Sequence, residues 1–409
     1  MNRSHIHWPC LPLSEAFWFQ EGPGVRKWQF TNSGIKLLNV GNIEKEGTLN
    51  LAKTDRHLSE EEVANKYSHF LVDAGDLVIA SSGISFDDDG FLRTRGAFVE
   101  KHQLPLCLNT STIRFKAIEG VSDLCFLRFW LNGHEFRSQI TKLVTGTAQQ
   151  NFGPSHLKAI KITLPPLEEQ RRIAEILDRA QSLISKRREA IGQLDTLTQA
   201  IFLEMFGDPV TNPKGWKIKI CKSICSRITV GIVVQPASYY QEYGVPALRS
   251  QNIKQNSIST DNLVFFSQID NETKLAKTRV RSGDVVLVRT GQPGTAAIIP
   301  EELDGVNAID LLITTPCKNI VDSVYLCSFF NSAWGKKLVS SSQVGQIQKH
   351  LNVGILNNAQ IICPPLPLQQ EFAHRVEAVE KLKAAHRASL SELNALFASL
   401  QHRAFRGEL

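Results

Sequence analysis

Residues 164–177 read Leu-Pro-Pro-Leu-Glu-Glu-Gln-Arg-Arg-Ile-Ala-Glu-Ile-Leu, and a related stretch, Cys-Pro-Pro-Leu-Pro-Leu-Gln, returns at residues 363–369. The two stretches are 199 residues apart. In both, a Pro-Pro pair ends an apolar run, and a long segment of helix-forming residues follows, which is typical of a strand leading into a helix. This spacing predicts an internal repeat, and the repeat decides the architecture.

Further landmarks keep the same order in the two halves. The aligned pairs are 146–149 with 345–348 and 127–132 with 326–331 at offset 199, 74–79 with 282–287 at offset 208, and 38–43 with 248–253 at offset 210. The drift of the offset indicates loops of different length within one scaffold. The sequence of each half therefore predicts short strands, then a short helix, a polar loop, and a last strand before the Pro-Pro pair. The short helix is expected near 125–144 in the first half and near 324–339 in the second.

The two segments that follow the Pro-Pro pairs predict long helices, the first over 168–205. Apolar residues recur in steps of four and three for about five heptads, which is typical of a coiled-coil seam. The seam positions are Ile173, Leu177, Ala180, Ile184, Arg187, Ile191, Leu194, Thr198, Ile201 and Met205, and then Phe372, Val376, Val379, Lys383, His386, Leu390, Leu393, Phe397, Leu400 and Ala404. Because a whole globular half separates the helices, we expect them to pair antiparallel within one molecule.

The predicted fold class is α/β (α+β), with two similar globular domains and a pseudo-two-fold internal repeat. The expected divisions are a first domain at 1–166, a first helix at 167–206, a second domain at 207–365 and a second helix at 366–409. Two matched helices would hold the two globular domains at a fixed distance and rotation, as a spacer does.

Composition narrows the class of protein. The chain has 409 residues, of which 42% are hydrophobic and 21% charged, and its net charge is +6. Residues 207–366 carry +5 of that charge, so we expect more phosphate attraction from the second half. We expect a cytoplasmic protein without membrane contact, because no apolar run is long enough to span a bilayer and the N-terminus lacks a signal-peptide pattern. Eight scattered cysteines without a CxxC pair predict reduced thiols and no zinc site.

Motifs for catalysis are missing from the sequence. It contains no GxxxxGK[ST] phosphate loop, no strand-linked GxGxxG, no GxSxG and no HExxH. The Asn/Asp-Pro-Pro-Tyr motif expected of an amino-methyltransferase is also absent. The acidic run 87–90 lacks the spacing of a calcium loop and reads as a solvated turn. We therefore predict a non-catalytic chain that holds no cofactor and no metal.

With these residues in view, the chain resembles the specificity subunit of type I restriction-modification systems. Residues 164–177 and the following Phe206-Gly-Asp-Pro are similar to that family's central conserved region, and the second copy, which ends in Phe-Arg-Gly-Glu-Leu at 405–409, is similar to its distal one. The stretches 75–78, 109–114 and 215–216 look like parts of its target recognition domains. One departure is that Pro367 and Leu368 replace the Glu pair of the first copy.

The resemblance implies a set of partners. Each globular half would be a target recognition domain that reads one part of a bipartite, asymmetric site on double-stranded DNA. The helices would form the spacer and dock two methyltransferase subunits, which carry S-adenosylmethionine, and a restriction subunit with motor and nuclease activity would join them. Two alternatives stay open at this point: a related system with fused partners, and a non-catalytic coiled-coil scaffold whose domains bind protein or RNA.

The repeat also selects candidate DNA-binding residues, because loops that differ between the copies can carry sequence information. Two loops in each half qualify: one follows the Gly-Asp strand and one precedes the Pro-Pro strand. The candidates are Ser81, Ser82, Ser85, Arg93, Arg95, Gln149, Gln150 and Asn151 in the first half, and Arg289, Thr290, Gln292, Gln343, Gln346, Gln348 and Lys349 in the second. Arg289 is the preferred guanine reader, whereas Gln149 and Gln348 occur in both copies and favour a loop or phosphate role.

Overall fold

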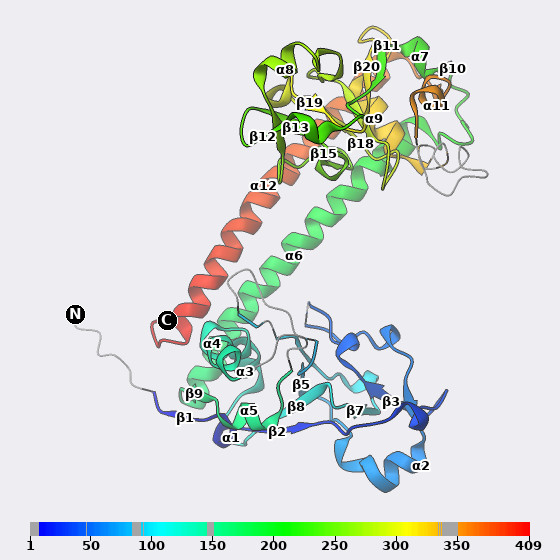
Figure 1. Ribbon diagram of the computed structural model, residues 1–409. Helices are drawn as coiled ribbons and strands as arrows, with labels where there is room; N and C mark the ends of the chain where they lie inside the picture. Colours follow the sequence, from blue (N-terminus) through cyan, green and yellow to red (C-terminus); the bar gives the residue numbers. More distant parts are fainter. Residues whose placement is uncertain are drawn as a thin grey trace. The chain divides into compact units, whose positions relative to one another are not determined.

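The computed structural model describes residues 8–45, 47–83, 91–92, 94–144, 151–333, 335, 337 and 351–409. The chain divides into two compact units, the first formed by Met1–Arg187 with Ser389–Leu409 and the second by Arg188–Ala388. Each unit therefore contains one globular domain together with one end of each long helix (Figure 1). This division differs from the four consecutive parts predicted from the sequence, because each domain packs against both helices.

The first domain is built around small sheets. A four-stranded antiparallel sheet has the order β2 (Phe17–Glu21), β8 (Thr112–Ala117), β5 (Leu77–Ala80), β6 (Gly96–Phe98). A three-stranded sheet has the order β4 (His57–Leu58), β3 (Ile35–Leu38), β7 (Leu106–Leu108), in which β3 and β7 are parallel. The strand before the Pro-Pro pair, β9 (Lys161–Thr163), pairs with β1 (Cys10–Pro12) at the start of the chain.

Helices of the first domain contribute buried residues to its largest core. These helices are α1 (Leu13–Ala16), α3 (Leu124–Leu131), α4 (His134–Leu143) and α5 (Pro154–Lys158), whereas α2 (Glu60–Glu62) has no buried residue. The single helix predicted near 125–144 is thus two helices, which separate at Asn132 and Gly133. The buried rings of Trp130 and Phe136 fill the core, and Ile173 and Leu177 from the first long helix join them.

The second domain repeats this plan. Its main sheet has the order β11 (Cys225–Val230), β20 (Leu311–Pro316), β17 (Val285–Val288), β18 (Ala296–Ile298), with the same antiparallel pairing as in the first domain. A second sheet has the order β12 (Tyr240–Gln241), β16 (Val264–Phe266), β13 (Val245–Leu248), β19 (Asn307–Ala308). Two-stranded pairs join β10 (Ile218–Ile220) to β21 (Gln360–Ile362), and β14 (Ile253–Lys254) to β15 (Ser257–Ile258).

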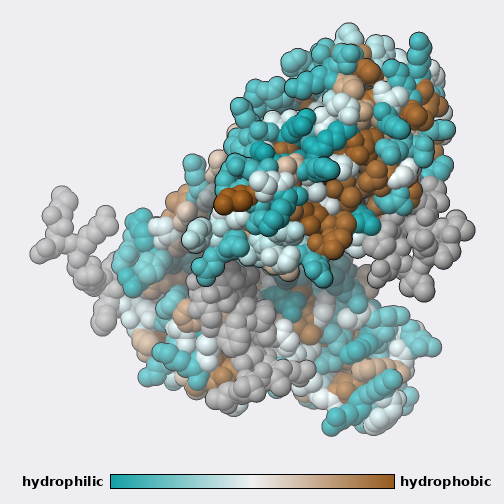
Figure 2. All heavy atoms as spheres, turned by 45° about the horizontal axis from the view of Figure 1, so that its top comes forward, coloured by the Kyte–Doolittle hydropathy of each residue, from teal (hydrophilic) through white to brown (hydrophobic). Residues whose placement is uncertain are grey.

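The α-helices with bounds in the described part of this domain are α7 (Cys221–Ile224), α8 (Gln268–Glu272), α9 (Ser323–Asn331) and α11 (Val353–Asn357). The helix predicted near 324–339 is α9 over its first part, and half of the remaining residues lie outside the described ones. Apolar groups reach the surface between polar ones (Figure 2). The exposed large apolar side chains of this unit include Leu203, Val210, Ile218, Ile220, Val233, Val234 and Ile269.

The repeat is visible at single hydrogen bonds. Gln170 is fully buried, and its side chain accepts from Asp123 N at 2.9 Å and donates to Pro165 O at 2.8 Å. Gln369, 199 residues later, accepts from Asp322 N at 2.9 Å and donates to the carbonyl of the preceding Pro-Pro pair at 2.8 Å. The glutamine of the motif therefore ties the start of each long helix to the start of the short helix of its own domain.

The long helices are α6 (Leu167–Phe206) and α12 (Leu366–Ala404). In the first unit the C-terminal end of α12 lies beside the N-terminal part of α6, because Ala404 shares a core with Ala174 and Leu177. In the second unit the relation is reversed: Phe372 of α12 contacts Phe202 of α6, with ring centroids 5.6 Å apart. The two helices are thus antiparallel within one chain, as the sequence predicts.

The predicted seam agrees with the burial of both helices, because all twenty predicted positions are buried or half-buried. Lys383 is the main polar seam residue, and its ammonium contacts Asp195 at 2.8 Å and Glu380 at 2.7 Å. Burial opposes the charge of Lys383, but these two carboxylates outweigh burial and raise its pKa. The prediction missed the buried rings of Phe202 and Phe206, which face inward because the end of α6 also packs against α9. No helix within the described ranges is long and apolar enough to cross a membrane.

Candidate nucleic-acid interface

The two loops chosen from the sequence meet at the same place in each domain. Ser81 and Arg289 directly follow the equivalent strands β5 and β17. In the first domain Phe152 N donates to Ser81 O at 3.0 Å, and in the second Leu351 N donates to Arg289 O at 3.2 Å. Phe152 and Leu351 follow the second loop, so the structure brings the end of that loop to the start of the first.

Arg289 is held at this junction by Asp310. Its guanidinium Nη1 lies 2.9 Å from Asp310 Oδ1, and the Thr290 hydroxyl donates to Asp310 Oδ2 at 3.0 Å. Asp310 lies in the turn between β19 and β20 with a φ of 50°, a conformation that Asp tolerates better than most residues. The Arg289 side chain keeps 28% of its surface exposed. Because a guanidinium has five N–H donors, Arg289 can bind Asp310 and still donate to a base edge.

At the equivalent junction of the first domain, the residue after the strand is the neutral Ser81. Ser81 is 1% exposed, its N–H donates to Ser111 O at 3.0 Å, and its hydroxyl points to Thr110 O at 3.5 Å. DNA binding by Ser81 stays a prediction, and its burial favours a role in holding the loop.

The other candidates divide by exposure. Asn151 and Gln292 are exposed, whereas Ser82 and Arg95 are half-buried, and Arg95 O also accepts from Ala80 N at 2.8 Å. The remaining candidates lie outside the described residues: Ser85, Arg93, Gln149, Gln150, Gln343, Gln346, Gln348 and Lys349. Of the candidates that can be placed, Arg289 and Thr290 are the ones the structure brings together.

Residues shared by both copies hold the scaffold at the opposite end of the same strands. Asp76 accepts from Asp73 N and Asp284 accepts from Arg281 N, both at 2.9 Å. Burial raises the pKa of Asp76, although the neighbouring Lys116 and other groups partly offset this effect. The Gly-Asp motif of the repeat is thus explained by the turn that leads into β5 or β17.

At this end the two domains differ in charge. In the first domain the ammonium of Lys116 pairs with Asp73, whereas the equivalent of Asp73 in the second is Arg281. Arg281, Arg227, Lys277 and Arg279 line an open cavity of about 750 Å³ together with Asp304. Burial lowers the pKa of the Arg227 guanidinium although Asp284 favours its charge. These four cations are part of the basic excess predicted for the second half, and they can attract phosphate.

Metal chemistry finds no support within the described ranges, where no group of three His, Cys, Asp or Glu side chains could hold an ion. The eight cysteines are free, and the Cys221 and Cys225 sulfurs lie 3.9 Å apart. The candidate interface therefore consists of two loop junctions, one after β5 and one after β17. At the second junction Arg289 is held in place by Asp310. Such an arrangement suits recognition of a polyanion.

A family model described as the type I restriction modification DNA specificity domain matches residues 30–193 and again residues 213–395. The chain belongs to this family. The two matches fall on the two copies of the repeat, so each copy is a DNA specificity domain. The match to DNA specificity domains disfavours the alternative of a coiled-coil scaffold that binds protein or RNA. It identifies the chain as a DNA-recognition component.

Named relatives agree with this assignment. The chain is similar to the EcoKI specificity subunit of Escherichia coli K12, with 22% identity over 98% of this chain and 89% of the relative. It is also similar to the EcoBI specificity subunit of Escherichia coli, with 24% identity over 75% and 70%. The MjaVIII specificity subunit of Methanocaldococcus jannaschii is 23% identical over 67% and 68%.

Solved structures share the fold of the specificity domains. The type I restriction-modification S subunit from M. genitalium matches with a TM-score of 0.55 and 14% identity, over 99% of this chain and 98% of that one. A chain from a study of complex assembly and conformational transition of the type I R-M system matches with a TM-score of 0.59 and 18% identity, over 99% of both chains.

Sequence reasoning missed Asp310, the residue that fixes Arg289. It lies 21 residues beyond Arg289, and the pairing depends on β17 and β20 being neighbours, which no local pattern reveals. One signal was present: the alignment of the copies places Asp310 in the turn that corresponds to Asn109–Ser111, a stretch that also resembles the family.

Proposed function

We propose that this chain is the sequence-specific DNA-binding subunit of a type I restriction-modification enzyme and that each domain reads one part of a bipartite site. The observation that carries the proposal is the double match to a DNA specificity domain within one chain. Two domains of one fold joined by an antiparallel helix pair suit two short recognition segments at a fixed spacing.

The site read by the two domains is asymmetric, because the candidate readers differ. The second domain presents the ordered pair of Arg289 and Asp310, where the first has buried Ser81. Arginine matches the acceptors of guanine in the major groove, and a neutral, buried serine does not. The two segments of the target are therefore expected to be different sequences rather than an inverted repeat.

The partners proposed for the chain are two methyltransferase subunits, which bind S-adenosylmethionine, and a restriction and translocase subunit. The proposal follows from the family, since the relatives are named as specificity subunits of restriction enzymes. The internal repeat supports two methyltransferase copies, because each copy of the repeat offers one helix start with the same buried glutamine. The chemistry of methyl transfer and cleavage belongs to those partners.

The test is a methylated-base map of cells that carry the chain together with its cognate methyltransferase subunit. The expected result is one motif with two defined segments and a fixed number of unspecified bases between them. Arg289→Ala should relax one position of one segment only. A contiguous motif, or a motif unchanged by deletion of this chain, would refute the proposed function.

A further inference from the structure

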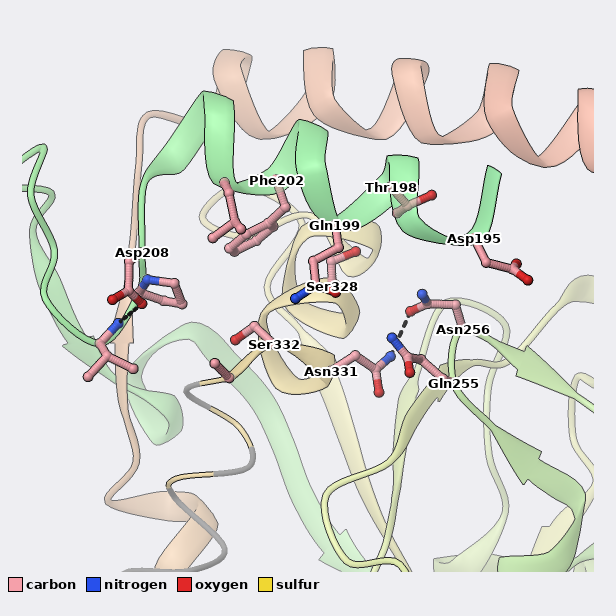
Figure 3. Close-up of a pocket in the computed structure, with 14 residues that line it drawn as sticks. Asp195, Thr198, Gln199, Phe202, Asp208, Gln255, Asn256, Ser328, Asn331 and Ser332 are labelled. Atoms are coloured by element: carbon pink, nitrogen blue, oxygen red, sulfur yellow. Dashed lines mark hydrogen bonds between the residues drawn. The ribbon is translucent and has the colours of Figure 1, made fainter. Parts of the chain in front are cut away.

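A cavity of about 340 Å³ lies in the second unit between the end of α6 and the helix α9 (Figure 3). Phe202 and Gln199 point into it from α6, and Ser328 and Asn331 face them from α9. The Thr198 hydroxyl oxygen at its margin is buried and has no hydrogen-bond partner among the described residues. A cavity of about 150 Å³ takes a benzene ring, so this one has room for an aromatic side chain.

The internal repeat explains why the cavity exists. At offset 199 the equivalents of Ser328 and Thr198 are Phe129 and Phe397. In the first unit these two phenyl rings contact each other, with centroids 6.1 Å apart, and fill the space between α3 and the end of α12. The second copy replaces both rings with small hydroxyl side chains, so a place that the first copy fills itself is left open.

The neighbouring contacts show that the comparison is between equivalent positions. Phe126 packs on Phe405 with centroids 5.5 Å apart in the first unit. Their equivalents, Tyr325 and Phe206, pack at 4.8 Å in the second unit. The aromatic pair nearest the C-terminal ends of α6 and α12 is therefore present in both copies. The neighbouring pair, Phe129 with Phe397, has no aromatic equivalent in the second copy.

The charges around the cavity select its occupant. Asp195 and Asp208 are the ionisable groups of its lining, and both are acidic. Lys383 pairs with Asp195 from the helix seam, whereas Asp208 accepts from two uncharged groups of the described residues, Val210 N at 2.9 Å and the Thr211 hydroxyl at 3.3 Å. An acidic lining repels DNA phosphates and attracts a cation. The exposed apolar side chains of Leu203 and Val210 lie at the same opening.

We propose that this cavity receives an aromatic side chain with a basic neighbour, presented by a methyltransferase subunit. The aromatic part follows from the rings that fill the equivalent space in the first copy, and the basic part from the acidic lining. The identity of the partner rests on the proposed function. Because Phe129 and Phe397 fill the equivalent space in the first copy, the two methyltransferase subunits are held by different contacts, although the repeat gives them equivalent helices.

The first experiment tests the chemistry of the cavity without any partner. Binding of benzylamine and of phenylacetate to the full chain is measured by ligand-observed NMR. Benzylamine should bind about five-fold more tightly than phenylacetate, the factor that one favourable charge contact gives. Asp208→Asn keeps an acceptor for Val210 N, and it should remove that preference. Equal binding of the two probes, or binding that Ser328→Phe/Thr198→Phe leaves intact, would overturn the proposal.

The second experiment transplants the aromatic pair of the first copy. Ser328→Phe/Thr198→Phe should fill the cavity, keep or raise the melting temperature, and lower methyltransferase affinity at one of the two sites at least ten-fold in a titration by native mass spectrometry. Thr196→Phe, which adds a ring on the exposed side of α6, is the matched control and should assemble normally.

The outcomes separate the two claims. If Ser328→Phe/Thr198→Phe folds and still binds two methyltransferase subunits with wild-type affinity, the cavity is not a docking site, while the proposed function stands. If the variant assembles normally but loses DNA binding, the occupant is DNA and the proposal is wrong. If the wild-type chain binds no methyltransferase subunit at all, the proposed function itself fails. Asp208→Asn, which keeps the cavity open, supplies the same test should the double variant not fold.

Discussion

Arg289 is the single side chain that we expect to carry sequence information in this protein. Its guanidinium is ordered before DNA arrives, because Asp310 fixes one nitrogen and Thr290 in turn holds Asp310. Ordering a long side chain in advance lowers the entropy lost on binding. Its Nε is buried and has no hydrogen-bond partner among the described residues, so the group is only partly satisfied by the protein.

We expect Arg289→Ala to cost about 1–3 kcal/mol of binding to the cognate site if it reads a guanine. Asp310→Asn should weaken the same base position by a smaller factor, because the amide keeps the shape of the carboxyl group but not its charge. Both variants are assayed in the assembled methyltransferase by sequencing methylated random DNA. Equal losses on every sequence would instead assign Arg289 to a phosphate, and an unchanged motif in both variants would place the pair outside the interface.

Gln170 and Gln369 contrast with Arg289, because the same residue occurs at this position in both copies and serves the fold. Replacing either by Leu leaves buried backbone donors and acceptors without partners, at about 1–3 kcal/mol for each such group. Gln170→Leu and Gln369→Leu should therefore lower the free energy of unfolding by similar amounts, measured by urea denaturation, without changing the DNA motif. Gln193→Leu, at an exposed position of α6, serves as the control. A motif change in Gln170→Leu with unaltered stability would contradict the scaffold role.

At the scale of elements, the helix pair is the part of the fold that the sequence predicts best. Periodicity is a local property, so the seam of α6 could be found without knowing its partner. The burial of Phe202 and Phe206 could not, because it depends on α9, which lies more than a hundred residues further along the chain. The division at Asn132 had a local signal that the prediction overlooked, because the pair Asn132-Gly133 is typical of a turn between two helices.

The seam predicts a sharp contrast between adjacent residues of α6. Ile184 is 2% exposed and Leu183 is 53% exposed. Ile184→Asp places a carboxylate in an apolar seam and should cost several kcal/mol of unfolding free energy. Leu183→Asp, which has the same charge one residue away, should cost less than about 0.5 kcal/mol. Thermal or urea denaturation of the two variants measures the loss of unfolding free energy. Equal losses would mean that the seam is assigned to the wrong face of α6.

At the scale of the whole molecule, we expect the two copies to contribute differently to DNA recognition. The repeat makes the scaffolds alike, and differences at matched positions then carry function. Arg289 faces Asp310 where the first copy has Ser81, and Arg281 replaces Asp73. The sequence located these loops but could not say which side chains are exposed, because exposure depends on turns from distant strands. Several candidate residues of both halves lie outside the described ranges and stay predictions.

The basic cavity of the second domain predicts how DNA binding by the assembled complex depends on salt. Arg281→Asp installs the residue of the first copy and should reduce the slope of log K against log salt by about one, the change expected for one lost phosphate contact. The loss should be the same on cognate and unrelated DNA, which distinguishes it from Arg289→Ala. Anisotropy titrations of the assembled complex at several salt concentrations measure the slope, and an unchanged slope would place Arg281 away from the DNA.

The spacing of the two half-sites supplies the last prediction, which rests on the proposal that α6 and α12 act as a ruler. Lys383 pairs with Asp195, so a point after Gly192 in α6 lies nearly opposite a point after Ala385 in α12. Inserting heptads at both points keeps the seam in register. One heptad adds about 10 Å, or about three base pairs, and turns the half-sites out of phase on the DNA helix.

Three heptads add about 32 Å, which is close to one turn of B-DNA at about 34–36 Å. We therefore expect the three-heptad variant to methylate a motif with the same two segments and a gap longer by about nine or ten base pairs. The one-heptad variant should lose activity because its two domains no longer face the same side of the duplex. A control with three heptads in α6 alone breaks the pairing with α12 and should be inactive as well. If the three-heptad variant methylates the original motif with its original gap, something other than the helix pair sets the distance, since no rigid spacer lengthened by about 32 Å can leave the separation of two bound half-sites unchanged.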